Sequence, residues 1–212
     1  MDRVQRNGGT AGVVAGILLA LLFVLFMSLG EEMMAPEPAK SLAVMTQKWS
    51  TFQLASLLGL LTAGVAVPFT VGIATRLRDK APTRARALLY LVLLGLAGHG
   101  LGSVIGWFGG RAIVQYAAAD QTGALHAWVA LSAVNTGLSM FGNAFTGAGT
   151  LIAGWAIMST KVLGAGVAWV GIVAGVAQIL SLFTAAGPVF LAGFLLTIVW
   201  LLYAGYSLMQ AK

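Results

Sequence analysis

Long uninterrupted runs of apolar residues dominate this chain, and short polar or charged stretches separate them. A helix rises about 1.5 Å per residue, so roughly 20 apolar residues cross the hydrocarbon core of a bilayer. The pattern predicts six membrane-spanning helices, over residues 11–30, 49–75, 87–108, 127–158, 162–184 and 188–210. The expected fold class is all-α, a polytopic transmembrane bundle that forms one integral membrane domain over residues 1–212.

Prolines and glycines shape the expected connections. Residues 31–48 are expected to be an irregular segment, in which Pro36 and Pro38 stop the first helix from continuing. Residues 109–126 are expected to hold a short interfacial helix. The fourth run is longer than a bilayer needs, and either tilt or a glycine-rich break within residues 142–149 would explain its length.

Charged residues predict the orientation of the bundle. Between the second and third runs lie Arg76, Arg78, Lys80, Arg84 and Arg86. Because Lys and Arg are enriched in cytoplasmic loops, this loop and both termini are expected in the cytoplasm. The net charge of +6 then reflects topology, and no nucleic-acid partner is expected. A cleaved signal peptide over residues 1–30 is the alternative interpretation of the first run.

The composition supports the membrane class. Hydrophobic residues make up 59% of the chain and charged residues 8%, against about 25% charged residues in soluble domains. The 28 glycines allow close packing of membrane helices, for which lipid provides no hydrophobic driving force. The chain has no cysteine, which excludes disulfides and thiolate metal sites.

The few polar residues inside the runs gather on helix faces that also carry small residues. His99 shares a face with Gly95, Gly102 and Gly106. The fourth run carries a polar stripe made of Ser132, Asn135, Ser139, Asn143, Thr146 and Thr150. The helical rise places His99 and Asn135 roughly 12 to 14 Å below the outer boundary, and Gln178 roughly 9 Å below it.

Two interpretations of these polar residues remain open. They could line a polar pocket in the outer half of the bundle that binds a small or lipid-like ligand. Its residues would be His99, Asn135, Ser139, Asn143 and Gln178. They could instead form interhelical hydrogen bonds, with the glycines making room for His99 to meet a polar partner across the helix interface.

Candidate catalytic chemistry is sparse. No Asp or Glu lies deep in any run, so no carboxylate relay for proton-coupled transport is visible. Neither a HExxH motif nor a nucleophile elbow is present. No catalytic residue or metal ligand is therefore assigned, and the protein is expected to be non-enzymatic. His99 could hold haem or a pigment, but His126 lies too near the outer surface to serve as a second axial ligand.

Four segments carry a resemblance to a known family. They read RNGGTAGVVAG, VAVPFTVGIATRLRD, GAGTLIAGWAIMSTKVLGAGVAWVGIVAGVAQIL and IVWLLYAGYSLM. Together they resemble a family of bacterial membrane proteins of about six helices that is defined only as a domain of unknown function. The resemblance implies residence in the bacterial inner membrane and brings no functional residues with it.

The sequence thus favours a non-enzymatic inner-membrane protein. We expect an accessory or structural subunit of a membrane assembly, with the lipid bilayer and either another membrane protein or a second copy as partners. A small-molecule transporter or channel is the alternative. A haem or pigment carrier that uses His99 is the third hypothesis, and no cofactor is identified.

Overall fold

The computed structural model describes residues 3–30, 33, 37–183 and 188–211. Over these residues the fold is all-α, as predicted, without a strand. The elements are α1 (Arg3–Leu29), α2 (Pro38–Gln47), α3 (Trp49–Leu77), α4 (Pro82–Ala117), α5 (Gln121–Thr160), α6 (Ala165–Leu180), the 3-10 turn η2 (Ser181–Phe183) and α7 (Pro188–Gln210). Helical structure therefore covers each of the six predicted runs, and α2 is an additional helix.

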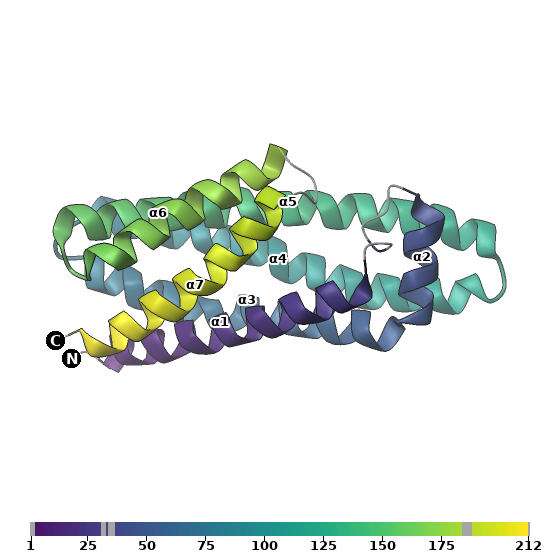
Figure 1. Cartoon of the computed structure of the whole chain (residues 1–212), viewed down its shortest axis with the longest axis horizontal. Coiled ribbons are helices and arrows are strands. Elements are labelled where there is room, and N and C mark those ends of the chain that lie inside the picture. Colours follow the sequence, from purple (N-terminus) through teal and green to yellow (C-terminus); the bar gives the residue numbers. More distant parts are fainter. Residues whose placement is uncertain (1–2, 31–32, 34–36, 184–187, 212) are drawn as a thin grey trace.

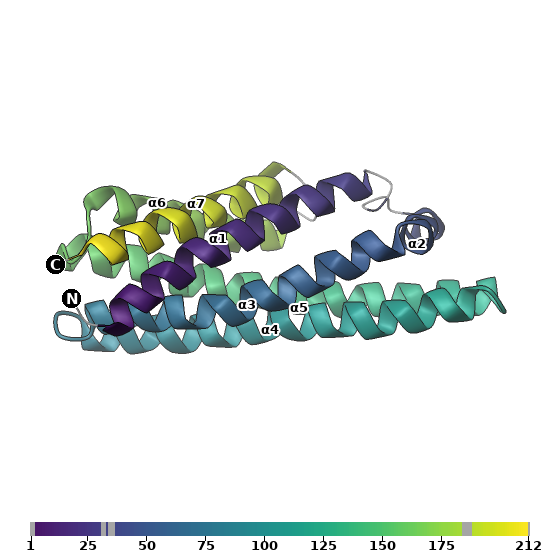
Figure 2. The same ribbon diagram turned by 90° about the horizontal axis from the view of Figure 1, so that it is seen from below.

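Six long helices lie side by side along one axis, and α2 runs across them at one end (Figures 1 and 2). Both described ends of the chain lie at the opposite end, together with the α3–α4 and α5–α6 turns. We call the end of the bundle that carries α2 the α2 end. We call the opposite end the basic end, because Arg78 and Lys80 lie in its α3–α4 turn. The basic loop and both described ends of the chain therefore lie at the same end of the bundle, and their location in the cytoplasm stays a prediction.

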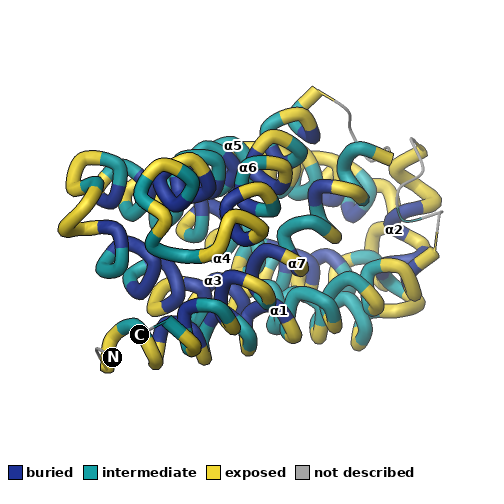
Figure 3. The backbone as a smooth tube through the Cα atoms, turned by 60° about the vertical axis from the view of Figure 1, so that its left-hand side comes forward, coloured by how far each residue is buried: buried dark blue, intermediate teal, exposed yellow. Residues whose placement is uncertain are grey.

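Five helices within the described residues are long and apolar enough to cross a membrane: α1, α3, α4, α6 with η2, and α7. The helix α5 is the longest, with 40 residues, but it is not in this set. Its asparagine, serine, threonine and glycine residues lower its mean hydropathy. Buried positions face the inside of the bundle and exposed positions face outward (Figure 3). Large apolar side chains such as Val24, Phe108 and Trp169 are exposed on this outer surface.

The helix α2 corrects, over Pro38–Gln47, the prediction that residues 31–48 are irregular; residues 31–32 and 34–36 of that range lie outside the described residues. It begins at Pro38, which occupies the first turn, where the missing proline N–H is not needed. Leu42 and Met45 of α2 are buried against a cluster that includes Ile113 and Trp128. The Trp128 Nε1–H donates a hydrogen bond to the Ser41 hydroxyl at 2.8 Å. This tertiary packing stabilises a helix too short to be stable alone.

One further expectation about the connections is wrong. The predicted interfacial helix in residues 109–126 does not exist as a separate element, because α4 continues to Ala117 and α5 begins at Gln121. Of the two explanations left open for the length of the fourth run, the break within residues 142–149 is absent, since α5 is continuous there. Gly142, Gly147 and Gly149 serve close packing instead, because a Cβ on any of them would meet atoms of a neighbouring helix at 2.9 Å or less.

Glycines on α1 bring three helices together near the basic end. A Cβ on Gly8 would stand 2.8 Å from the Gly72 Cα of α3. A Cβ on Gly9 would stand 2.7 Å from the Gly205 carbonyl oxygen of α7. Gly12, one turn later, lies against Phe69 and Gly205. Small residues at this spacing let helices approach closely in a membrane.

Cations of the basic end bind the far end of α5. The Arg84 Nη1 donates to the Ser159 hydroxyl at 2.6 Å, and its guanidinium lies 5.0 Å from the centre of the Trp155 ring. The Lys80 Nζ donates to the Thr160 carbonyl oxygen at 3.5 Å. Positive charge at a helix C-terminus is favourable because of the helix dipole. These contacts join α4 and the α3–α4 turn to α5 at the basic end.

Candidate functional site

The long helices surround a cavity of about 400 Å³. Residues of α1, α3, α4, α5, α6 and α7 all contribute to its lining. On α3 the lining runs from Phe52 to Ile73, a distance of about 30 Å along the helix at roughly 1.5 Å per residue. The cavity is therefore elongated and follows the axis of the bundle.

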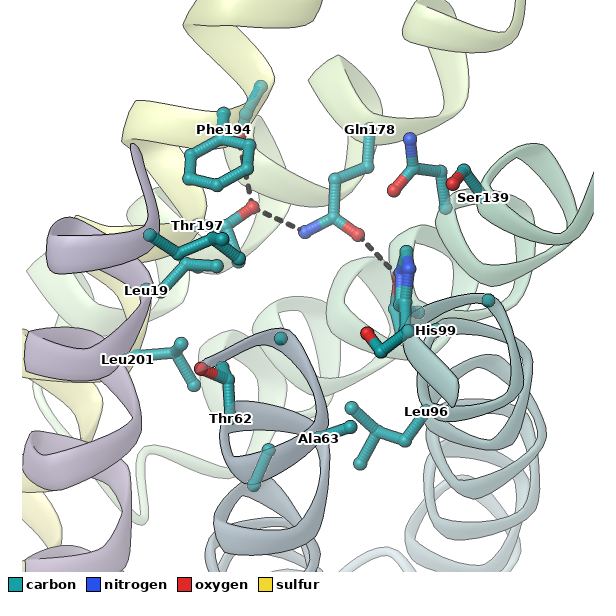
Figure 4. Close-up of a pocket in the computed structure, with 18 of the residues that line it drawn as sticks. Leu19, Thr62, Ala63, Leu96, His99, Ser139, Gln178, Phe194, Thr197 and Leu201 are labelled. Carbon is teal, nitrogen blue, oxygen red and sulfur yellow. Dashed lines mark hydrogen bonds between the residues drawn. The ribbon is translucent and has the colours of Figure 1, made fainter. Parts of the chain in front are cut away.

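The structure brings all five predicted site residues to this one cavity. They are His99 on α4, Asn135, Ser139 and Asn143 on α5, and Gln178 on α6. Figure 4 shows His99, Ser139 and Gln178 around the same space, opposite Thr62, Leu201 and other lining residues. Ser139 is exposed as well as lining the cavity, which places it at an opening.

Gln178 is held by hydrogen bonds that join three helices. It is buried, and its Nε2 donates to the Thr197 hydroxyl of α7 at 2.6 Å (Figure 4). The Thr146 hydroxyl of α5 lies 2.8 Å from Gln178 Oε1 and donates to it. Both threonine hydroxyls also lie 2.7 Å from a carbonyl oxygen four residues earlier in their own helices. For Gln178 the interpretation as an interhelical hydrogen-bonding residue therefore holds.

Asn143 extends this network toward the end of α6. Its Nδ2 donates to the Ser181 hydroxyl at 3.4 Å, a long and weak contact. The Ser181 hydroxyl donates to the Gln178 carbonyl oxygen at 2.6 Å. Asn143 is only partly buried and lines the cavity, so it combines a structural contact with access to the cavity.

His99 has no hydrogen-bond partner among the described residues, so the expected polar partner across the helix interface is absent there. Its ring lies against Gly142 of α5, where a Cβ would stand 2.6 Å from His99 Cε1. The glycine that makes room for the imidazole is therefore Gly142 of α5, and not only the expected glycines of α4. The ring borders the cavity without being fixed by a polar neighbour.

Asn135 also lacks a partner. Its Oδ1 is a buried oxygen with no hydrogen bond among the described residues. The amide fits into the space left by two glycines of α4: a Cβ on Gly102 would stand 3.6 Å from Oδ1, and one on Gly106 would stand 3.2 Å from Nδ2. An unsatisfied buried acceptor costs about 1–3 kcal/mol. Such a cost is tolerated more readily where a ligand satisfies the group.

The rest of the cavity is uncharged and mainly apolar, with hydroxyl groups such as those of Thr62, Thr70 and Thr150 in its lining. Toward the basic end it is bordered by Phe69, Ile73, Leu88, Trp200 and Leu201. No Asp, Glu, Lys or Arg occurs among the lining residues that the structure describes. The cavity thus has a polar region in the half nearer the α2 end and an apolar region nearer the basic end.

Sequence reasoning missed the part of the site that α1 and α7 provide. Thr197 is the main polar residue there, and it is the only polar residue in the apolar stretch FLAGFLLTIVWLL of the last run. Its position four residues after the buried Gly193 was a signal for an inward face. Phe190 and Phe194 gave no such signal, because an aromatic residue fits a lipid-facing position equally well.

Comparison with known proteins adds no identification. No protein-family model, curated protein or solved structure matches this chain. The resemblance to a six-helix bacterial family therefore stays a prediction, and the function is argued from the cavity alone.

Proposed function

We propose that this protein crosses the bacterial cytoplasmic membrane six times, with both termini in the cytoplasm, and binds an amphipathic, lipid-like molecule in its cavity. It catalyses no reaction of its own. In this role it serves as an accessory or structural subunit beside another membrane protein or a second copy.

The geometry of α5 supports the sixth crossing. This helix packs along both α4 and α6, and its two ends lie at opposite ends of the bundle (Figure 1). Its polar side chains Asn135, Asn143 and Thr146 border the cavity rather than the outer surface. A helix with its polar groups turned inward can cross a bilayer despite a lower mean hydropathy.

The observation that carries the binding proposal is the pairing of an elongated apolar cavity with polar groups that have no protein partner. Cavities of 300–1,000 Å³ with few polar groups are typical of small-molecule sites, and this one has about 400 Å³. His99 and Asn135 supply the polar groups. An amphipathic molecule would satisfy these groups and fill the apolar part at the same time.

The extent of the lining favours binding over transport. The lining reaches Ile73 on α3 and Leu88 on α4, but it includes no residue of the α3–α4 turn. Arg84 and Lys80 lie beyond this lining, where they contact the end of α5. A cavity whose lining stops short of this turn supports a binding site better than a continuous path across the membrane.

Native mass spectrometry of the protein purified from its membranes in mild detergent tests this proposal. We expect a bound amphipathic molecule in the native protein and at least a tenfold lower occupancy in Leu96→Trp, because Leu96 lines the cavity (Figure 4). Leu94→Trp is the matched control, since Leu94 is 45% exposed on the outer surface of the same helix. Equal occupancy in both variants, or an empty native protein, would overturn the proposal.

A further inference from the structure

We infer that the ligand of this cavity has an uncharged head group that donates as well as accepts hydrogen bonds, and a single apolar tail that points toward the basic end. This inference rests on the proposed function, and it specifies the class of molecule. Monoacylglycerols, long-chain alcohols and other lipids with a hydroxyl or amide head group belong to this class.

The first reason is the absence of compensating charge. The described lining residues include no Asp, Glu, Lys or Arg. A carboxylate, phosphate or ammonium group placed among them would lose its hydration without gaining an ion pair, which is strongly unfavourable. Two cations of the basic end, Arg84 and Lys80, bind the end of α5 instead of the cavity. An uncharged head group avoids this loss.

The second reason is the hydrogen-bonding capacity that the protein leaves unused. The Asn135 Oδ1 is an acceptor without a donor among the described residues. A neutral imidazole offers one N–H donor and one acceptor nitrogen, and neither is used at His99 within the described part of the chain. Asn135 and His99 both line the cavity. A hydroxyl or amide head group can then both donate to the protein and accept from it, whereas an ester can only accept.

The third reason is the shape of the apolar region. A Cβ on Gly100, next to His99, would stand 4.0 Å from Ala63 Cβ, so His99 lies near the level of Ala63 on α3. From there the lining continues to Ile73, about 15 Å further along α3 toward the basic end. The Thr62 and Thr70 hydroxyls in this stretch donate to carbonyl oxygens of their own helix, so their protons are already used and the lining around them is mainly apolar. A cavity this long and of only about 400 Å³ accepts one chain.

Three probes with the same acyl chain separate these properties: monoolein, oleate and methyl oleate. Binding to the protein in nanodiscs is measured by native mass spectrometry at neutral pH. We expect monoolein to bind at least tenfold more tightly than either of the others. If oleate binds as tightly as monoolein, the inference that the head group is uncharged is wrong. If methyl oleate binds as tightly as monoolein, the inference that the head group must donate a hydrogen bond is wrong. If none of the three binds, the proposed function itself fails.

Two variants test the roles of the unpartnered side chains. His99→Phe and Asn135→Leu should each weaken monoolein binding at least fivefold and leave methyl oleate binding within twofold. Ser132→Ala is the control, because Ser132 belongs to the same polar stripe of α5 but does not line the cavity. A fall in binding of both probes together would overturn the head-group assignment, since it would indicate a change in cavity shape.

Folding of the Asn135 variant can be judged separately. Since the buried oxygen is unsatisfied in the empty protein, Asn135→Leu should keep or raise the thermal unfolding midpoint without ligand. Added monoolein should raise the unfolding midpoint of the native protein more than that of this variant. A lower midpoint of the empty variant, together with an unchanged gain from monoolein, would overturn the role of Asn135 in binding.

Discussion

Gly142 of α5 lies directly against the His99 ring of α4, and a Cβ at this glycine would stand 2.6 to 2.7 Å from three atoms of the imidazole. The glycine is therefore what permits a histidine to border the cavity at this point. The relationship couples helix packing to the site, because any side chain at position 142 must displace the ring.

The variant Gly142→Ala should consequently impair ligand binding more than it impairs folding. We expect at least a fivefold loss of monoolein affinity, because His99 must rotate away from its position at the cavity wall. Gly137→Ala is the matched control on the same helix, since a Cβ at Gly137 would meet nothing within 4 Å. Binding is measured in nanodiscs and folding by the thermal unfolding midpoint. Equal binding by the two variants would contradict this role of Gly142.

Gln178 should behave differently, as a stabilising residue. Its side chain bonds to Thr146 and Thr197, and hydrogen bonds between membrane helices contribute about 0.6 kcal/mol each on average. We therefore expect Gln178→Leu to lower the free energy of unfolding by about 1 kcal/mol. A double-mutant cycle with Thr197→Val isolates the coupling free energy between Gln178 and Thr197. Strictly additive effects of the two substitutions would show that this hydrogen bond contributes nothing.

Much of the candidate site follows from local geometry. About 100° of rotation per residue already places Asn135, Ser139 and Asn143 on one face of a helix, and polar groups in a membrane turn inward. The six apolar runs are visible for the same reason, since bilayer thickness sets their length. These parts require no knowledge of how the helices are ordered in the bundle.

Other parts depend on tertiary contacts that spacing does not contain. The helix α2 is short and stabilised by packing against Ile113 and Trp128, which are far away in sequence. The glycines of residues 142–149 looked like a break because glycine both weakens helices and permits close packing. Only the neighbouring helix decides between these roles. The same holds for His99, whose lack of a partner could be recognised only once the helices around it were known.

The cap of α5 predicts a pH dependence of stability at the α2 end. The Gly123 N–H donates to Asp120 Oδ1 at 2.9 Å and the Tyr116 hydroxyl donates to Oδ2 at 3.1 Å, and these bonds lower the pKa of Asp120 below its usual value of 3.8. A lowered pKa in the folded state means that the stabilisation is present above about pH 4 and is lost as the pH falls through the folded-state pKa.

Asp120→Ala should accordingly lower the thermal unfolding midpoint at pH 7, and the difference from the native protein should shrink as the pH falls below 3.8. Asp120→Asn should retain most of the midpoint at pH 7, because its amide oxygen can still accept from the Gly123 N–H. If the unfolding midpoints of Asp120→Ala and the native protein differed by the same amount at pH 7 and below pH 3.8, the capping role would be contradicted.

Single-cysteine labelling tests the topology, and the crossing by α5 is its most informative part. The chain has no cysteine of its own, so each variant carries one thiol. Gln121 and Lys161 flank α5 at its two ends, and both are exposed. With six crossings, Gln121→Cys should react with a membrane-impermeant maleimide in intact cells, whereas Lys161→Cys should react only after permeabilisation. Lys80→Cys should follow Lys161→Cys, because both lie at the basic end.

If Gln121→Cys and Lys161→Cys reacted from the same side, α5 would not cross the membrane. The reversed pattern would instead place the termini outside, because the arrangement of the helices fixes only which ends lie together and the cell determines which of the two sides faces the cytoplasm.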